Sequence, residues 1–336
     1  MAGVAKSTVS RYLNGGSVSK EKREKIDKAI EETKYVPNNF AQSLKAKKNN
    51  LIGIIIPRLD SYATSRTLSG IDEVLRESGY QIIINCTYQS KEREIESMES
   101  FFNQGIAGII LIIEEMTVEH REILNKIKIP ALLIGQDDEE ITCMIHDDYK
   151  SGYEAALLLI SKGHINISYI EEDKEDVSSW KRRKNGFLAC IKDNEIKDIN
   201  ILKINNNDNL EISSLISKII NNNSTAVLCA TDKIAVEILH ALQKNNIKVP
   251  EDISVMGIGD YEVSKLIIPE LTTVHYSYRT FGKIVAEKII NLVTGEDGCQ
   301  KTIMPTKIIM RETVDKIKKW CYYKFIKPVQ IRIGLI

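Results

Sequence analysis

The chain has 336 residues, with 46 lysines and arginines balanced by 46 aspartates and glutamates, and 43% of its residues are hydrophobic. This length predicts about two or three packed units, and the apolar fraction suffices for more than one core. The composition excludes a wholly disordered chain.

The sequence also bears on compartment and redox state. No apolar run approaches the roughly 20 residues that span a bilayer, and Met1 to Lys6 lacks the apolar segment of a signal peptide. We therefore expect a cytoplasmic protein without membrane contact. The cysteines show no metal-binding spacing, so reduced structural thiols are expected. They are Cys86, Cys143, Cys190, Cys229, Cys299 and Cys321.

The zero net charge is distributed unevenly. Residues 1–50 carry 11 basic and 5 acidic side chains, and residues 315–336 carry 6 and 1, which leaves 29 basic and 40 acidic side chains between them. A basic first segment on an acidic body is typical of a nucleic-acid binder with a separate ligand or partner domain. A lysine-coated helix surface would give the same distribution.

Residues 1–50 predict helices followed by a linker. Between Ala5 and Leu13 apolar side chains recur at helical spacing, and an asparagine and two glycines then end the helix. Ser19 is a suitable N-cap for a second helix that runs to about Thr33. Asn39–Lys45 predicts a short third helix before a polar linker.

From Leu51 onward, apolar runs rich in isoleucine, leucine and valine alternate with amphipathic segments. This alternation predicts an α/β fold of doubly wound parallel sheets, in two lobes with a cleft between them. The predicted strands are Leu51–Ile56, Gln81–Asn85, Gly108–Ile113, Ala131–Ile134, Ile167–Ile170, Thr225–Cys229 and Ile253–Gly257. The predicted helices are Leu68–Ser78, Lys91–Gln104, Ser151–Lys162, Arg183–Asp193, Glu211–Asn221 and Lys233–Asn245.

Enzyme signatures are missing. The sequence contains no G-x-x-x-x-G-K-[ST], H-E-x-x-H or G-x-S-x-G. Gly257-Ile258-Gly259 lacks the third glycine of a dinucleotide fingerprint and predicts a turn at a strand end. His146-Asp147-Asp148 admits a metal or catalytic role, but polar residues of a small-molecule cleft are favoured, since ligands bind at the carboxyl ends of parallel strands. We expect no catalysis, cofactor or metal.

The first predicted helix has the features of a DNA-recognition helix. Ala2-Gly3-Val4 supplies a sharp turn and an apolar plug ahead of it, as in the second half of a helix-turn-helix. Its hydroxyl and cationic side chains suit base edges and phosphates. An ordinary amphipathic helix is the alternative if the segment is taken alone.

Residues 2–57 resemble the LacI/GalR family of bacterial transcription regulators. The pattern A-G-V-x-x-x-T-V-S-R, then N, V-S-x-x-x-R and Y-x-P-N-x-x-A-x-x-L stands in order and at the family's spacing. The resemblance continues to about Val314. Matching motifs are Gly152-x-x-Ala155, Gly163-His164, Arg183-x-x-Gly186-Phe187, Asp232-x-x-Ala235, Pro250-x-Asp252-Ile253-Ser254-Val255 and Leu271-Thr272-Thr273-Val274. QSLKAKKNNLIGIIIPRLDSYATSR and HDDYKSGY look like sucrose-operon repressors of low-GC Gram-positive bacteria.

The resemblance implies a DNA-binding role for named residues. Lys6, Ser7 and Arg11 would face bases. Residues near phosphates would be Thr8, Asn14, Ser17, Ser19 and Asn38. Asn39–Lys45 would be a hinge helix in which Leu44, beside Ala41, enters a minor-groove step of operator DNA. An ordinary packing role is the alternative for Leu44.

The resemblance also implies a sugar or nucleobase effector in the cleft. Residues expected to bind it are Ser61, Tyr62, Asp147, Arg183, Thr231 and Asp232. Because Lys181 to Lys184 is a basic run, a plain surface role is the alternative for Arg183. The family's usual effector aspartate is Gly259 here, so either Asp260 replaces it or the pocket admits a bulkier ligand such as a disaccharide.

Four segments are expected: a truncated helix-turn-helix head (1–37), a hinge and linker (38–50), a two-lobed effector-binding and dimerisation domain (51–314) and an atypical basic tail (315–336). The tail lacks leucine heptads that would support a tetramerisation helix. The resemblance implies a homodimeric repressor of a sugar-utilisation operon, with operator DNA and a sugar effector, such as sucrose or a related saccharide, as partners. The alternative is a sugar sensor that has lost specific DNA binding.

The family's first helix, which precedes A-G-V, is absent from this sequence. The recognition helix would then lack the helix it packs against, so we expect weak or no specific operator binding by the chain as given. A gel shift should show tighter binding when the chain is extended upstream by the missing codons. Equal affinity of the two chains would contradict this expectation.

Overall fold

The computed structural model describes residues 2–13, 16–33, 50–173, 178–205, 209–296 and 300–317. The chain forms two compact units, Met1–Asn50 and Leu51–Ile336, each treated separately below. The predicted third helix and most of the basic tail fall outside the described residues.

The first unit contains α1 (Lys6–Leu13) and α2 (Lys20–Thr33). The turn before α1 has Gly3 at a φ of +61°, a conformation that favours glycine. The hydroxyl of Tyr12 donates a hydrogen bond to the Asp27 carboxylate and so joins the helices. Ile26 on α2 is buried, whereas α1 has no fully buried residue.

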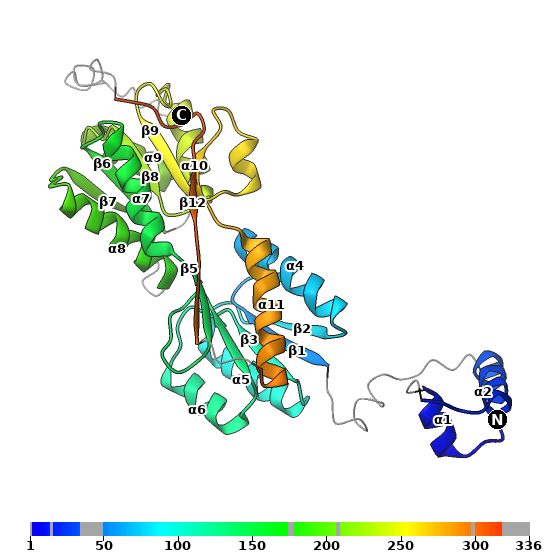
Figure 1. The fold of residues 1–336 in the computed structure, drawn as a ribbon. Coiled ribbons are helices and arrows are strands. Elements are labelled where there is room, and N and C mark those ends of the chain that lie inside the picture. Colours follow the sequence, from blue (N-terminus) through cyan, green and yellow to red (C-terminus); the bar gives the residue numbers. More distant parts are fainter. Residues whose placement is uncertain are drawn as a thin grey trace. The chain divides into compact units, whose positions relative to one another are not determined.

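In the second unit, each of two lobes is built on a six-stranded sheet (Figure 1). The strand order is β11-β5-β4-β3-β1-β2 in the first lobe and β12-β10-β9-β8-β6-β7 in the second. All pairings are parallel except that of β10 with β12. The first sheet comprises β1 (Leu51–Ile56), β2 (Gln81–Cys86), β3 (Gly108–Leu111), β4 (Ala131–Ile134), β5 (Cys143–His146) and β11 (Lys301–Met304). The second comprises β6 (Ile167–Glu172), β7 (Ile199–Ile204), β8 (Ala226–Cys229), β9 (Ser254–Gly259), β10 (Thr272–His275) and β12 (Lys307–Ile309).

Helices cover both faces of each sheet (Figure 1). Separate apolar clusters fill the two faces of the first sheet, which explains why its strands are isoleucine-rich rather than alternating. The first lobe has α4 (Tyr62–Glu77), α5 (Lys91–Asn103), α6 (Val118–Ile127) and α11 (Tyr278–Thr294). The second has α7 (Asp148–Ser161), α8 (Ser178–Asp193), α9 (Asn209–Asn221), α10 (Asp232–Lys244) and the 3-10 helix η1 (Glu262–Lys265).

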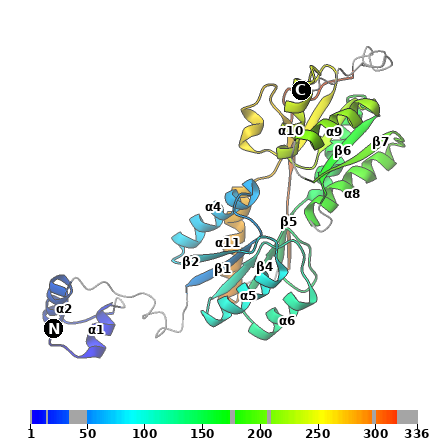
Figure 2. The same ribbon diagram turned by 180° about the vertical axis from the view of Figure 1, so that it is seen from behind.

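The chain passes between the lobes three times: from β5 to α7, from β10 to α11, and from β11 to β12. In the view from behind, the last of these is an extended segment that reaches from one lobe to the other (Figure 2). The predicted doubly wound α/β fold with two lobes is thereby confirmed. Strands β5, β7, β10, β11 and β12 and helices α6 and α11 were not predicted.

Glycines bring one helix pair in each lobe into backbone contact. A Cβ atom on Gly152 of α7 would lie 1.9 Å from the carbonyl oxygen of Arg183, and one on Gly186 of α8 would lie 1.9 Å from that of Tyr149. In the first lobe, Gly70 of α4 and Gly282 of α11 approach the partner helix in the same way. Even a methyl group would force these helices apart.

We predict that Gly152→Ala and Gly186→Ala each lower the free energy of unfolding by about 1–3 kcal/mol, because the added Cβ overpacks the crossing. Urea denaturation measures the change. Lys192→Ala, an exposed change on α8, is the control and should be nearly neutral. A Gly152→Ala chain as stable as the control would contradict the prediction.

Candidate functional site

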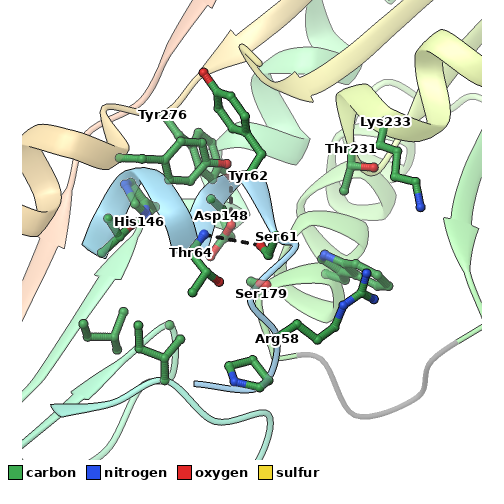
Figure 3. A pocket seen from close by; sticks show the side chains of 18 of the residues that line it. Arg58, Ser61, Tyr62, Thr64, His146, Asp148, Ser179, Thr231, Lys233 and Tyr276 are labelled. Atoms are coloured by element: carbon green, nitrogen blue, oxygen red, sulfur yellow. Dashed lines mark hydrogen bonds between the residues drawn. The ribbon is translucent and has the colours of Figure 1, made fainter. Parts of the chain in front are cut away.

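A cavity of about 660 Å³ lies between the two lobes of the second unit, beside the crossing segments (Figure 3). Its lining includes residues after the carboxyl ends of β1 and β4 and residues at the starts of α4, α8 and α10. Figure 3 shows Thr231 and Lys233 across the cavity from His146. Parallel strands bring their carboxyl ends to one edge of each sheet, which is where ligands of open α/β sheets bind.

The floor of the cavity holds a buried ionic centre. The Asp148 carboxylate accepts hydrogen bonds from Arg183 Nε (2.9 Å), Tyr276 Oη (2.8 Å) and Arg182 Nη2 (3.0 Å). Arg183 Nη1 donates to the carbonyl oxygen of Ala230 in the second lobe, at 2.9 Å. Arg182 Nη2 also donates to the carbonyl oxygen of Gly135 in the first lobe, at 2.8 Å. A buried carboxylate is tolerable because these donors surround it.

Aromatic rings form one wall. The His146 ring stacks on Tyr276 with 4.7 Å between centroids and lies 4.3 Å from Phe281. Burial lowers the pKa of His146 to about 4, so this ring is neutral at pH 7. Tyr62 of the first lobe and Tyr261 of the second meet with 4.5 Å between ring centroids. The aromatic wall is therefore contributed by both lobes.

Charged side chains also line the cavity. Arg58 binds Asp60 through two hydrogen bonds, from Nε (2.9 Å) and Nη2 (3.0 Å). Further lining side chains are Glu114, Glu172, Lys233 and Glu237. Burial raises the pKa of the Glu237 carboxyl, whereas Lys233 lowers it and Glu172 raises it further.

Four of the predicted effector residues line the cavity: Ser61, Tyr62, Arg183 and Thr231. Ser61 and Thr231 also cap helices, since their hydroxyls accept from the backbone N–H groups of Thr64 and Ile234. Arg183 is buried against Asp148 rather than exposed on a basic surface.

Three predicted residues lie outside the described lining, each for a local reason. Asp147 caps α7 by accepting from Lys150 N (3.1 Å), and the next residue, Asp148, faces the cavity instead. Asp232 is fully buried and accepts from Tyr261 N (2.7 Å) and Ser264 Oγ (2.6 Å). Asp260 is bound by Arg311 and by His275.

Sequence reasoning favoured His146-Asp147-Asp148 as cleft residues and named Tyr62, but it chose Asp147 as the effector carboxylate and missed Tyr276 and Tyr278 of the aromatic wall. Tyr276 and Tyr278 belong to a crossing segment more than a hundred residues from Asp148 in sequence, so no local pattern connects them. The HDD motif pointed to the correct turn, but the choice between its two aspartates depends on which one caps α7.

In the first unit, the side chains of Lys6, Ser7 and Arg11 on α1 are exposed, and Thr8 is half-buried. Ser17 and Ser19, which precede α2, are also exposed. The other predicted DNA-contacting residues lie outside the described part of the chain. They are Asn14, Asn38, Ala41 and Leu44.

The described residues provide no group of three histidine, cysteine or carboxylate side chains that could hold a metal ion. Within the same residues, no helix has the length and apolar character needed to cross a bilayer.

Comparisons with known proteins agree with this architecture. A family model described as "Bacterial regulatory proteins, lacI family" matches residues 1–38, and one described as "Periplasmic binding protein-like domain" matches residues 156–314. The chain is 32% identical to the sucrose operon repressor of Staphylococcus xylosus over 294 residues, covering 87% of this chain and 91% of that protein. It is 28% identical to the ribose operon repressor of Lactococcus lactis subsp. lactis (strain IL1403), covering 95% and 97%.

Among solved structures, the lac repressor dimer bound to operator and the anti-inducer ONPF is similar, with a TM-score of 0.84, 25% identity, and 93% of this chain and 96% of that chain covered. The likeness extends through nearly the whole of both chains. As its motifs predicted, the chain belongs to the lacI family of bacterial regulatory proteins.

Proposed function

We propose that the protein is a homodimeric transcription repressor that binds operator DNA through its first unit and a sugar effector in the cavity of its second. The cavity carries this proposal, because it combines a buried carboxylate–guanidinium centre with an aromatic wall in a chain of the lacI family. The curated relatives named above are repressors of a sucrose and a ribose operon. We propose that this chain likewise catalyses no reaction and acts in the bacterial cytoplasm, where its DNA partner lies.

The cavity chemistry suits a sugar. Adjacent hydroxyl groups of a sugar ring require both acceptors and donors, which Asp148 and Arg183 supply side by side. The aromatic rings of Tyr62 and Tyr276 line the cavity and give it an apolar wall against which the sugar ring would pack. The volume of about 660 Å³ falls within the range of about 300–1,000 Å³ usual for small-molecule sites.

The first unit supports a role in DNA binding. Exposed Lys6, Ser7 and Arg11 give α1 cationic and hydroxyl side chains suited to base edges in a major groove. The similar lac repressor structure contains operator DNA. Effector binding would then shift the balance between two arrangements of the lobes, and with it the affinity for DNA.

Footprinting on the DNA upstream of the chain's own gene, together with a thermal-shift screen of sugars, tests the proposal. For the chain extended upstream by the codons of the first helix, we expect a protected site that Arg11→Ala weakens, and a sugar that raises the Tm, since ligand at 100 times its Kd stabilises by about 2.7 kcal/mol. A sugar that binds without any protected DNA would favour the alternative, a sensor without specific DNA binding. Turnover of a sugar would contradict the absence of catalysis.

Neighbouring aspartates offer a matched test of the cavity. Asp148→Asn leaves the buried guanidinium of Arg183 and the half-buried one of Arg182 without their carboxylate, so we predict a loss of about 3–5 kcal/mol of stability and of sugar binding. Asp147→Asn should keep both, because asparagine also caps helices. Urea denaturation and calorimetric titration measure the two effects. Loss of binding in the Asp147 variant alone would place the effector elsewhere.

A further inference from the structure

We propose that the effector is an uncharged saccharide and that the cavity discriminates against phosphorylated sugars. This inference rests on the proposed function, since it specifies the charge of the ligand in the same cavity. Relatives named only by their operons leave the charge of the effector open, and the side chains of the cavity restrict it.

The guanidinium groups that could bind a phosphate are already paired with carboxylates. Arg183 and Arg182 both donate to Asp148, and Arg183 is buried. Arg58 donates two hydrogen bonds to the Asp60 carboxylate, in the bidentate arrangement with which an arginine would otherwise bind a phosphate. A phosphate group would have to displace a carboxylate from each of these cations.

The charge of the described lining is negative. It includes five carboxylates, against the three cations Arg58, Arg183 and Lys233, and Arg182 of the floor adds a fourth cation beside Asp148. The carboxylates are Asp60, Glu114, Asp148, Glu172 and Glu237. Lys233, an exposed cation on α10, lies within electrostatic reach of the carboxyl groups of Asp60 and Glu237. A doubly charged phosphate would therefore enter a field of its own sign.

Helix N-termini normally attract anions, and α4 and α10 both begin at the cavity. Each of these ends already has a side-chain acceptor, since the hydroxyls of Ser61 and Thr231 bind backbone N–H groups of the first turn. Each also has an aspartate at its start: Asp60 just before α4 and Asp232 at the first position of α10. The positive ends of both helices are thus partly neutralised.

The starts of α7 and α11 also lie in the described lining, at Asp148 and Tyr278, and so does the start of α8. Its Ser178 hydroxyl accepts a hydrogen bond from Arg182 Nη1 at 2.5 Å, and the same guanidinium binds Asp148. This end therefore takes part in the ionic centre of the floor. The carboxylates of the lining, in contrast, are acceptors for the hydroxyl hydrogens of a neutral sugar, which adds no charge to the cavity.

Matched ligand pairs test the inference on the full chain. Calorimetric titration would compare sucrose with sucrose 6-phosphate, ribose with ribose 5-phosphate, and glucose with both glucose 6-phosphate and glucosamine. We expect the best ligand to be uncharged, with a Kd at least about tenfold below that of its phosphate. The reason is that placing like charges next to one another weakens binding. Tighter binding of the phosphate or of the amino sugar would overturn the inference while leaving a sugar-responsive repressor intact. Binding of none of these probes would overturn the inference together with the proposed function.

Charge variants show whether the carboxylates cause the discrimination. Glu172→Gln combined with Glu237→Gln should lower the Kd of the phosphate and leave that of the sugar unchanged. The gap, meaning the ratio of the two Kd values, should therefore become smaller. Asp198→Asn, which removes one exposed acid of the same lobe away from the cavity, should leave the gap unchanged. Raising the salt concentration should also lower the Kd of the phosphorylated sugar and leave the Kd of the sugar unchanged, since salt screens like-charge repulsion. An unchanged gap in the double variant and in high salt would contradict the electrostatic origin.

Discussion

The ionic centre around Asp148 is the constraint on which the second unit depends. One carboxylate receives hydrogen bonds from two arginines of α8 and from a tyrosine of the β10–α11 crossing. Those arginines donate in turn to backbone carbonyls of both lobes, at Gly135 and Ala230. Because a buried charge without these partners would be costly, the first turn of α7, the start of α8 and the crossing segment must assemble together. The floor of the cavity is therefore set by electrostatics as much as by apolar packing.

Much of the fold was predictable from sequence because strands buried on both faces are continuous apolar runs. The runs at Leu51–Ile56 and Ala131–Ile134 coincide with β1 and β4. Strand β10 was not predicted from the sequence because Thr272–His275 is short and polar, and its burial comes from tertiary packing. In the cavity, Ser61 and Thr231 were predicted through the family resemblance, and both stand where a strand gives way to a helix. The choice of Asp148 over Asp147 was not predicted, because a cap can take either of two adjacent aspartates, and the contact with Tyr276 was missed because it joins segments remote in sequence.

The charge balance of the chain acquires a structural meaning at the same point. A net charge of zero conceals a basic first segment and an acidic middle. Part of that acidity lines the cavity, where Glu114, Glu172 and Glu237 outnumber the one lysine. The basic DNA-binding helix of the first unit attracts nucleic acid, whereas the acidic lining of the cavity repels it. A single chain can thus bind a polyanion at one site and an uncharged sugar at another, without competition between the two ligands.

The glycine crossings fix what can move. At Gly152 and Gly186, as at Gly70 and Gly282, one helix backbone touches the next with no side chain between them, so little can slide or repack there. The α7–α8 and α4–α11 pairs therefore behave as stiff twin rods, and all four helices begin beside the cavity or its floor. Motion between the lobes is left to the three crossing segments, which act as a short three-stranded pivot. A ligand that changes the distance between the helix ends at the cavity would therefore move the opposite ends of these helices further. No change of packing inside either lobe is needed for this movement.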